Sequence, residues 1–346
     1  MSLSLVVGGL AYTNFTSWSI DRDLLRASDT WSVQVADPSP VQIATVTEGQ
    51  SVMLLWNDAI LLRGAVDQRL LRAGVGGTTL ELSGRSRGGI LGDCSVPLNW
   101  RVASVSLADI ADLAVKQLGL NLDIVRESDD ASKLFKAVYG SPGESWWELL
   151  TRLAERRRCL VWETPAGLHV GRPDYESAPV GELRWAISGA RVARNNILSS
   201  EITWATSGRR SPVTVADAAG DADLWGGPAK VTRATDPVLV ELGLSRPLVL
   251  SPAATDAGDQ ARTKNAAQAE VSRRAGEAFR ATYHVQGVGP TASVPWAVNT
   301  NVVVRDEGAN VDGTYWIQAV QVTGSRDGHF TTLFLRERGA IQPESV

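Results

Sequence analysis

Residues 1–95 contain short runs in which apolar and polar residues alternate, and each run ends at a turn signal. One alternation covers residues 3–7 and ends at a Gly-Gly pair, and the runs 52–56 and 60–63 flank Asn57-Asp58. Because a period of two places every second side chain on one face of a strand, these runs predict strands. Asn-Asp between two such runs is typical of a two-residue hairpin turn. Many short strands at this spacing favour a closed or nearly closed barrel.

Between residues 100 and 175 the apolar residues recur at helical spacing instead. Ser106 is followed three residues later by Asp109, and Ser145 is followed by Glu148, so each pair can cap the start of a helix. Apolar stripes follow both pairs. This stretch therefore predicts an α/β insert within a chain that is otherwise rich in strands.

Strand patterns return after the insert, and one long Ala-rich pattern interrupts them. The further expected elements are a hairpin at 160–163 and 168–171, strands at 197–204, 212–216, 283–288, 301–305, 316–322 and 331–336, a loop at 217–228, and a helix at 256–280. The order is a β region, a helical insert and a second β region. The fold class predicted from this order is mainly β with an α/β insert (α+β).

The composition limits the classes of function. Hydrophobic residues make up 44% of the 346 residues and charged residues 21%, which predicts a packed globular protein of two or three domains. The formal net charge of −4 argues against a protein that binds nucleic acid through phosphate contacts, since such binding needs a basic surface. The N-terminus has no basic segment and no apolar run approaches 18 residues, so we expect no signal peptide, no membrane span and assembly in a cytoplasm.

Few residues carry candidate chemistry. Cys94 and Cys159 lack a CxxC spacing, and His169, His284 and His329 are the only histidines, so the sequence offers neither a disulfide framework nor a zinc signature. None of the histidines lies in a catalytic motif, and GxSxG is absent. The 38 acidic residues make some carboxylate pair inevitable, which singles out none of them. We predict no catalytic residue, no cofactor, no metal site and a protein that is not an enzyme.

The Gly-rich run at 84–89 resembles a phosphate-binding loop only superficially. It lacks the Gly-Lys-Ser/Thr ending of a P-loop, and we expect no helix after the glycines, as a dinucleotide fingerprint would require. A structural turn is the better interpretation.

Tryptophan is unusually frequent, with twelve residues against five phenylalanines. Trp146-Trp147 opens the second helix of the insert, where only one of two adjacent rings can face the core directly. The other ring either lies on a partner surface, where tryptophan is enriched, or packs within the chain. The sequence leaves both alternatives open.

Five motifs in order resemble those of Mu-type phage baseplate hub proteins, the phage late control protein D family. They are residues 80–87 with 91–95, residues 142–154, residues 196–198, residues 245–247 with the helix that follows, and residues 296–306 with the last strands. The positions that match the family, in a structural or interface role, are Gly84, Arg85, Asp93, Cys94, Gly143, Glu144, Trp146, Arg152, Asn196, Arg246, Pro247, Trp296 and Asn299.

The resemblance implies two tandem antiparallel β-barrel-like domains and a helix-containing insert domain in each chain. Three chains would form a trimeric pseudo-sixfold ring that adapts the sixfold tail tube to the threefold central spike. The expected domains are a first barrel at 1–98, an insert at 99–180 plus 235–284 with the long helix, a second barrel at 181–234 plus 285–337, and a C-terminal tail at 338–346.

The implied partners are two further copies of the chain, the central spike trimer and the tail tube or tube-initiator proteins, with wedge proteins and the tape measure as further candidates. DNA would pass through the lumen without specific binding, and no membrane is involved. The resemblance implies a late protein of a contractile tail, located in the virion baseplate after assembly in the host cytoplasm. A tailocin or a long non-contractile tail is a close alternative. A peptidoglycan-active tail enzyme or cell-wall-binding module is the alternative from another class.

Overall fold

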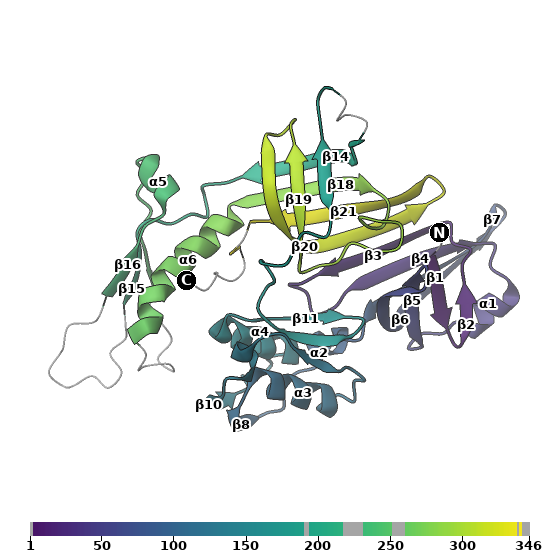
Figure 1. The fold of residues 1–346 in the computed structure, drawn as a ribbon. Helices are drawn as coiled ribbons and strands as arrows, with labels where there is room; N and C mark the ends of the chain where they lie inside the picture. Colours follow the sequence, from purple (N-terminus) through teal and green to yellow (C-terminus); the bar gives the residue numbers. More distant parts are fainter. Residues whose placement is uncertain (1–2, 190–193, 217–230, 251–259, 338, 341–346) are drawn as a thin grey trace. The chain divides into compact units, whose positions relative to one another are not determined.

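The computed structural model describes residues 3–189, 194–216, 231–250, 260–337 and 339–340. Strands dominate these residues, and helices lie in the insert and in a later segment of the chain, which confirms the expected class (Figure 1). The chain forms two compact units. The first contains Met1–Ser200 and Thr282–Phe334, and the second contains Glu201–Ala281 and Leu335–Val346. The loop expected at 217–228 lies outside the described residues.

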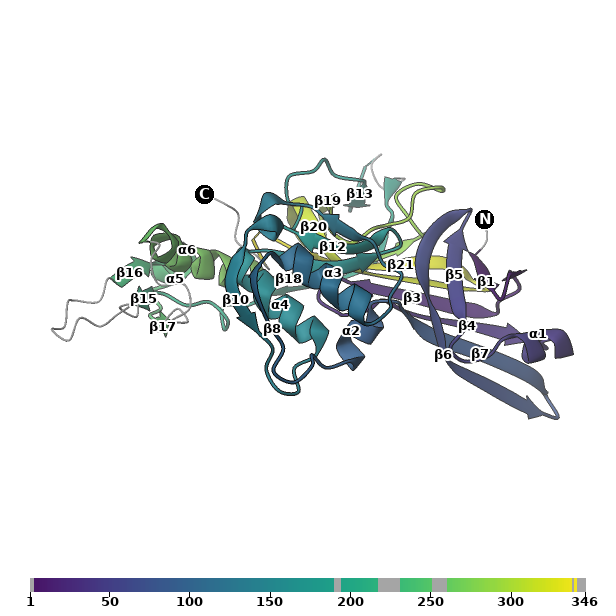
Figure 2. The same ribbon diagram turned by 90° about the horizontal axis from the view of Figure 1, so that it is seen from below.

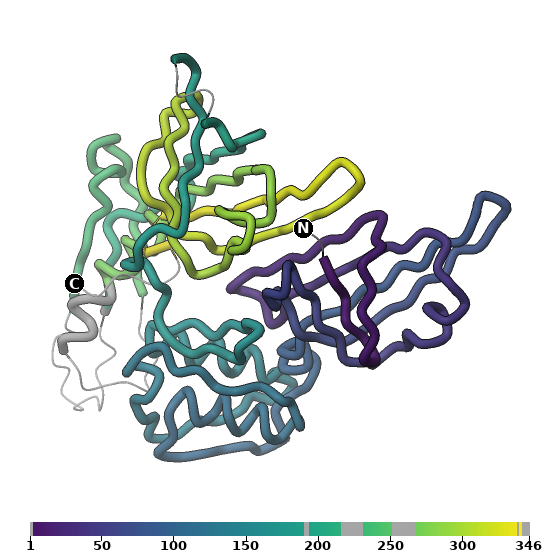
Figure 3. The backbone as a smooth tube through the Cα atoms, turned by 45° about the vertical axis from the view of Figure 1, so that its right-hand side comes forward, coloured from purple at the N-terminus to yellow at the C-terminus, as the bar shows by residue number. Residues whose placement is uncertain are grey.

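The N-terminal strands follow the predicted alternation. They are β1 Leu3–Val7, β2 Leu10–Tyr12, β3 Ser17–Asp23, β4 Thr30–Ala36, β5 Ser51–Trp56, β6 Ala59–Gly74 and β7 Gly77–Ser86, with the short helix α1 Pro40–Thr45. Asn57 and Asp58 both have positive φ, 46° and 72°, as a two-residue type I′ hairpin turn requires. The long β6–β7 hairpin extends from the sheet (Figure 3), and Val75 at its tip is fully exposed.

The insert has its own hydrophobic core. Its elements are α2 Gly89–Asp93, β8 Arg101–Val105, α3 Leu107–Gln117, β9 Ile124–Arg126, the 3₁₀ helix η1 Asp129–Ser132, β10 Phe135–Tyr139, α4 Trp146–Arg157, β11 Leu160–Thr164 and β12 Gly167–Gly171. Figure 2 shows α3 and α4 among these strands, and their apolar stripes meet in one buried cluster. Both predicted capping boxes are present, at Ser106 with Asp109 and at Ser145 with Glu148. The five-residue α2 corrects the expectation that no helix follows the glycines.

The remaining elements return to strand, as predicted. They are β13 Glu182–Trp185, β14 Ile197–Trp204, β15 Val213–Ala216, β16 Val231–Ala234, α5 Pro237–Glu241, β17 Leu248–Leu250, α6 Gln260–Glu277, β18 Phe279–Gln286, β19 Thr300–Asp306, β20 Val311–Ser325 and β21 Gly328–Arg336. In the second unit β15 lies between β16 and β17. The helix expected at 256–280 is α6, which the sequence prediction grouped with residues 99–180. In the structure Ala267 and Val271 of α6 pack against Val213 and Val215 of β15.

One strand joins the two β regions of the first unit. Residues 311–317 of β20 pair with β19, and residues 319–325 of the same strand pair with β3. Between these two ladders, the Gln318 carbonyl accepts the Leu24 N–H at 3.3 Å. A single strand therefore serves both regions, and the segments before and after the insert belong to one sheet.

The described strands of that sheet form an open path, so the β regions, expected to be barrel-like and closed or nearly closed, are not closed. Thirteen strands take part, in the order β14-β18-β21-β20-β3-β4-β7-β6-β5-β1-β2, with β19 on β20 and β13 on β19. The alternation of apolar residues predicts that a strand has a buried face, but it contains no information about which edge the strand pairs with. The edge strand β3 pairs with β20 of the other β region. This pairing stands where each region would otherwise have closed on itself.

A substitution at Gly324 tests the pairing of β20 with β3. Gly324 lies opposite Trp18 in the β3–β20 ladder, and a Cβ at this position would come within 2.2 Å of the buried indole ring. We expect Gly324→Ala to lower the free energy of unfolding by about 1–3 kcal/mol, as overpacking of a core does. Denaturant unfolding measures this change.

Gly74→Ala is the matched control, because Gly74 also lies in an antiparallel strand and has open space around the added Cβ. Its free energy of unfolding should change by less than about 1 kcal/mol. Equal losses in the two variants would contradict the account of Trp18 and Gly324.

Candidate functional site

Three buried polar residues connect the N-terminal strands to the insert. Ser86 ends β7, Asp29 precedes β4, and Glu163 lies in β11 of the insert. Their exposed fractions are 6%, 7% and 8%. The Ser86 hydroxyl donates to the Glu163 carboxyl and accepts the Asp29 N–H at 3.0 Å, while the Ser86 N–H donates to the Asp29 carbonyl at 2.9 Å. We call Asp29, Ser86 and Glu163 the polar junction.

Gly88 is required at this place by close packing. Its N–H donates to Glu163 Oε2 at 2.7 Å. A Cβ on Gly88 would lie 2.6 Å from that oxygen and 2.7 Å from the Ala27 carbonyl oxygen. Gly84 is restricted in the same way, because its Cβ would lie 1.9 Å from the Ala65 carbonyl oxygen of β6. The Gly-rich run thus allows close approach of backbone and carboxyl groups, in agreement with the expected structural turn.

Arg85 and Asp93, two of the family-motif positions, contact each other directly. The Arg85 guanidinium donates two hydrogen bonds of 2.9 Å to the Asp93 carboxylate, and its Nε donates to Asp67 at 2.7 Å. These bonds hold the pKa of Asp93 below its ordinary value and raise the pKa of Arg85. Because all three side chains are at least one-third exposed, solvent screens the ion pairs. Their role is to fix the turn that leads from β7 into α2.

The first two sequence motifs lie side by side. The Cys94 carbonyl accepts the Trp146 N–H at 3.0 Å, and the Val96 N–H donates to the Glu144 carbonyl at 2.8 Å. Gly143 has a φ of 80°, a backbone conformation that favours glycine. The segment that leaves the sheet is therefore hydrogen-bonded to the start of α4.

Arg152, which the resemblance also named, pairs with Glu144. Its Nε and Nη2 donate to the two Glu144 carboxylate oxygens at 2.7 and 2.9 Å, and Nη2 also donates to the Tyr139 carbonyl at 3.1 Å. Burial works to raise the pKa of Glu144. The hydrogen bonds from Arg152 and the Ser141 N–H, together with the charges of Arg152 and Arg156, outweigh burial and leave that pKa below its ordinary value. Glu148 instead caps α4.

Both tryptophans at the start of α4 pack within the chain. Trp146 is fully buried and meets Trp100 edge to face, with ring centroids 5.2 Å apart. Trp147 is partly buried against the same core. Of the two alternatives for the second ring, internal packing is the one that the structure supports.

Arg22 of β3 links the region after the insert to the polar junction. The Arg22 guanidinium donates to the Trp296 carbonyl, and its charge acts on the Asp29 carboxyl. Trp296 is buried, and a Cβ on Gly181 would lie 2.9 Å from its ring. Residues from the N-terminal strands, the insert and the C-terminal region therefore meet around one set of charges.

Two asparagines among the family-motif positions hold backbone together by their side chains. Asn196 accepts the Arg184 N–H and donates to the Glu182 carbonyl, both at 2.7 Å, so its amide bridges β13 to the start of β14. Asn299 accepts the Asp174 N–H at 2.8 Å and the Trp316 indole N–H at 3.0 Å. Neither residue is part of the polar junction.

Arg246 and Pro247 belong to the second unit. Arg246 exchanges two backbone hydrogen bonds with Ser211, of 2.8 and 3.0 Å, and its guanidinium donates to the Thr206 carbonyl. Pro247 directly precedes β17. The fourth motif therefore orders the loop between β14 and β15.

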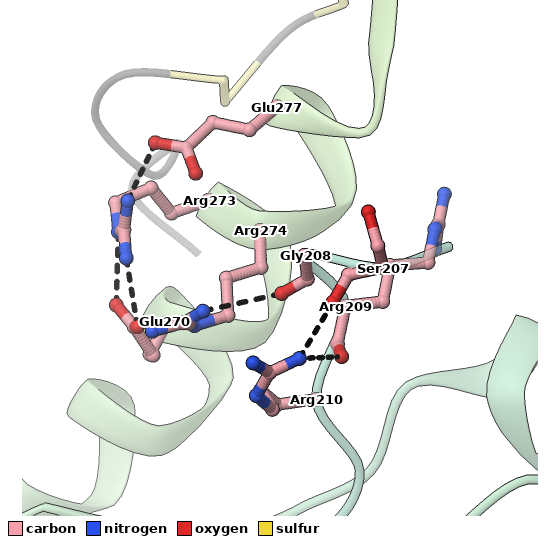
Figure 4. A network of polar contacts seen from close by, with 8 residues as sticks. All are labelled: Ser207, Gly208, Arg209, Arg210, Glu270, Arg273, Arg274 and Glu277. Atoms are coloured by element: carbon pink, nitrogen blue, oxygen red, sulfur yellow. Dashed lines mark hydrogen bonds and ion pairs between the residues drawn. The ribbon is translucent and has the colours of Figure 1, made fainter. Parts of the chain in front are cut away.

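Arginines satisfy successive carbonyls of that loop (Figure 4). Arg210 donates to the Ser207 and Arg209 carbonyls, and Arg274 of α6 donates to the Gly208 carbonyl at 3.1 Å. Arg274 is held by Glu270 at 2.6 Å. This network attaches α6 to the loop.

His169 helps to order a hairpin of the insert. His169 is hydrogen-bonded to Thr164 at 2.7 Å and to Glu127 at 2.6 Å, and its ring stacks on Trp162. The Thr164 hydroxyl also accepts the Ala166 N–H, so this line of contacts orders the β11–β12 hairpin. Within the described residues no group of three or more His, Cys, Asp or Glu side chains could hold a metal ion. No helix in the described part of the chain is long and apolar enough to cross a membrane.

In the comparisons with known proteins, two family models match adjacent parts of the chain, and these parts meet at the polar junction. Residues 2–86 match the family model of the Mu phage baseplate assembly protein GpP-like, N-terminal, and residues 88–171 match that of the baseplate hub protein gp44-like, second domain. The boundary between the two models falls between Ser86 and Gly88. No curated protein sequence matches the chain.

The fold is similar to solved tail proteins over its whole length. A tail protein from Neisseria meningitidis MC58 is 26% identical with a TM-score of 0.82, covering 99% of this chain and 98% of that one. The 43 kDa tail protein of prophage MuSo2 from Shewanella oneidensis is 22% identical with a TM-score of 0.80, covering 98% and 99%. The Escherichia coli c3393 protein, a component of the type VI secretion system, is 10% identical with a TM-score of 0.61, covering 99% and 79%.

Glu144→Gln tests the Glu144–Arg152 ion pair within the second motif. Because the pKa of Glu144 is depressed in the fold, its ionised form stabilises the folded state above about pH 4.3, and that stabilisation is lost as pH falls through the folded pKa. We expect the variant to be about 1–3 kcal/mol less stable at neutral pH. Below about pH 4.3 its free energy of unfolding should fall less steeply than that of the wild type.

Denaturant unfolding from neutral to acid pH measures both effects. Glu155→Gln, at an exposed position on the same helix, is the control and should keep the wild-type acid slope. If the free energies of unfolding of Glu144→Gln and the wild type fall equally steeply at acid pH, the ion pair does not have this role.

Proposed function

Since this chain belongs to the Mu-type family of phage baseplate hub proteins, structural components of phage tails, we propose that it forms one third of a trimeric ring in the baseplate. The ring adapts the sixfold tail tube to the threefold central spike. Its expected domains remain those of the sequence prediction, with two β modules and an insert. Three copies of two β modules present six modules to the tube and keep threefold symmetry towards the spike.

The shared strand β20 is the observation that carries this proposal. It fixes the N-terminal and C-terminal β regions of one chain to each other through continuous backbone pairing. Two modules that were free to move independently could not present a regular face to a tube. The chain is therefore suited to act as a rigid double module.

A closed ring of three copies requires head-to-tail contacts between unlike surfaces. We propose an obligate contact of about 2,000 Å² or more. The second unit supports an apolar contact, because exposed aliphatic side chains follow closely along its chain at Val238, Val240, Leu242 and Leu244. Soluble monomers rarely expose such groups together.

The remaining partners follow from the position of the ring between the tail tube and the spike. We propose contacts with the spike trimer, with the tube or its initiator, and with wedge proteins and the tape measure. DNA crosses the lumen without specific binding, which a lumen that is acidic on balance favours. The protein is made late and assembled in the host cytoplasm for a contractile tail, with a tailocin or a long non-contractile tail as the alternatives within this class.

The proposed role requires no chemistry, and we propose that the chain is not an enzyme. Both family models and the tail proteins of similar fold belong to tail machinery. They favour the structural role over a peptidoglycan-active enzyme or a cell-wall-binding module.

The mass of the purified chain in solution tests the ring. Light scattering coupled to size exclusion at micromolar concentration should give a trimer, because the contact is obligate and needs no partner protein. Dilution over two orders of magnitude provides the control for concentration-driven association. A monomer at every concentration would contradict the ring.

A further inference from the structure

The two β regions repeat one strand arrangement. The strands β3 to β7 are matched, after the insert, by β14 and β18 to β21. In the sheet, the first set has the order β3-β4-β7-β6-β5 and the second set has the order β14-β18-β21-β20-β19. Each strand of one set therefore has a counterpart at the same place in the other, both along the chain and across the sheet. The repeat ends at the outer strands, since β1 pairs antiparallel with β5, whereas β13 pairs parallel with β19.

The longest strands of the two sets, β6 and β20, are built in the same way. β6 has 16 residues and β20 has 15. Each follows a shorter strand, β5 or β19, which pairs only with its first half: β5 with residues 59–65 of β6, and β19 with residues 311–317 of β20. A short turn then leads from each long strand into β7 or β21. The preceding strand thus leaves the second half of each long strand free on one edge.

The two second halves differ in what pairs with them. In β20, residues 319–325 pair with the whole of β3, and Val322 is buried. In β6, residues 68–74 pair with β7 on one edge, and in the described part of the chain no strand pairs with the other edge. Leu71, which like Val322 lies three residues before the end of its strand, is 44% exposed. The second half of β6 therefore lacks the partner that its counterpart has.

The strand that could supply this partner is β14, the counterpart of β3. β14 pairs with β18 on one edge, and no strand among the described residues pairs with its other edge. Leu198 and Trp204 of β14 are 48% and 63% exposed, whereas Trp18 and Ile20 of β3 are buried. A single chain thus has one free edge of the β3 type, on β14, and one free edge of the β20 type, on β6.

We propose that β14 of one copy pairs antiparallel with residues 68–74 of β6 in the next copy, which repeats between chains the β3–β20 contact within a chain. This inference rests on the trimeric ring proposed above and names two surfaces that close it. Each copy has one edge of each kind, as a head-to-tail ring requires. In a ring of three, contacts of one type then alternate within and between chains, and both free edges are covered.

The β3–β20 ladder also supplies the register of the proposed pairing. In that ladder the first residue of β3 lies opposite the last residue of β20. The same alignment places Leu198 of β14 opposite Ala73 of β6, a large side chain over a small one, as the tryptophan of β3 lies over a glycine of β20. It also places Leu198, Leu71 and Trp204 on one face, because side chains alternate along a strand. The pairing therefore covers exposed apolar side chains of both edges together.

Intermolecular disulfides test the pairing and its register. On the opposite face, this register places Ser199 opposite Arg72 and Thr203 opposite Gln68. Chains with Arg72→Cys that are co-expressed with chains carrying Ser199→Cys should form a covalent dimer on mild oxidation, because directly opposite residues lie within disulfide reach. Gln68→Cys with Thr203→Cys should give the same result. Denaturing electrophoresis and mass spectrometry measure the mixed dimer.

The crossed combination, Arg72→Cys with Thr203→Cys, is the matched control. In the proposed register these residues are offset by four positions, about 13 Å along the strand, which is beyond disulfide reach. Each single variant controls for bonds to Cys94, which is partly exposed. Equal yields from matched and crossed combinations, or a trimer in which neither matched pair forms a dimer, would overturn the pairing and leave the ring standing. A chain that remains monomeric would overturn both.

A charge at Leu71 tests the same contact without a cross-link. Because Leu71 is exposed in the single chain, Leu71→Asp should keep the wild-type circular dichroism spectrum, but it places a charge in the strand contact. We expect the dissociation constant of the ring, measured by sedimentation, to rise by about tenfold or more. Val75→Asp, at the exposed hairpin tip beyond the paired residues, is the control and should assemble like the wild type. Equal dissociation constants for the two variants would count against the pairing.

Discussion

Backbone pairing between β3 and β20 is the contact on which the rest of the first unit depends. It joins a strand near the N-terminus to one near the C-terminus, and β20 pairs with β19 along its other half. Trp18 fits over Gly324 and so specifies the register, because a slip by one residue would place the indole against a side chain. Without this ladder, β3 would end the N-terminal sheet as an exposed edge, and two separate β regions would remain.

The ladder also positions the polar junction. Arg22 lies on β3, and the pairing brings its guanidinium to the Trp296 carbonyl on one side and near Asp29 on the other. Asp29 in turn contacts Ser86, through which Glu163 of the insert is attached. A buried hydrogen-bonded contact fixes orientation more strictly than apolar packing would. The insert, which is a separate family domain with its own core, is thereby held in a defined orientation to the sheet.

The sequence predicted features that depend on neighbouring residues, but it contained no signal for contacts between residues far apart in the chain. Both capping boxes and the Asn57-Asp58 turn were predicted, because each depends on residues within one turn of the chain. The β3–β20 pairing was not predicted, and closed or nearly closed barrels were expected instead. Alternation does not specify the partner of a strand, and Asp23 and Gln318 are 295 residues apart. The resemblance named Arg85, Asp93, Glu144 and Arg152 without their contacts. Asp29 and Glu163 were missed, although Glu163 ends a run of buried apolar residues and could have drawn notice as a buried acid.

Native-state hydrogen exchange under increasing denaturant measures the central claim, that the two β regions are one cooperative unit, most directly. If β20 unites them, the amides of β3 and of residues 319–325 share one free energy of opening, equal to that of β19 and β4. An N-terminal sheet that opens at clearly lower denaturant than the C-terminal strands would contradict the claim, because the two regions would then be independent modules joined only by the chain.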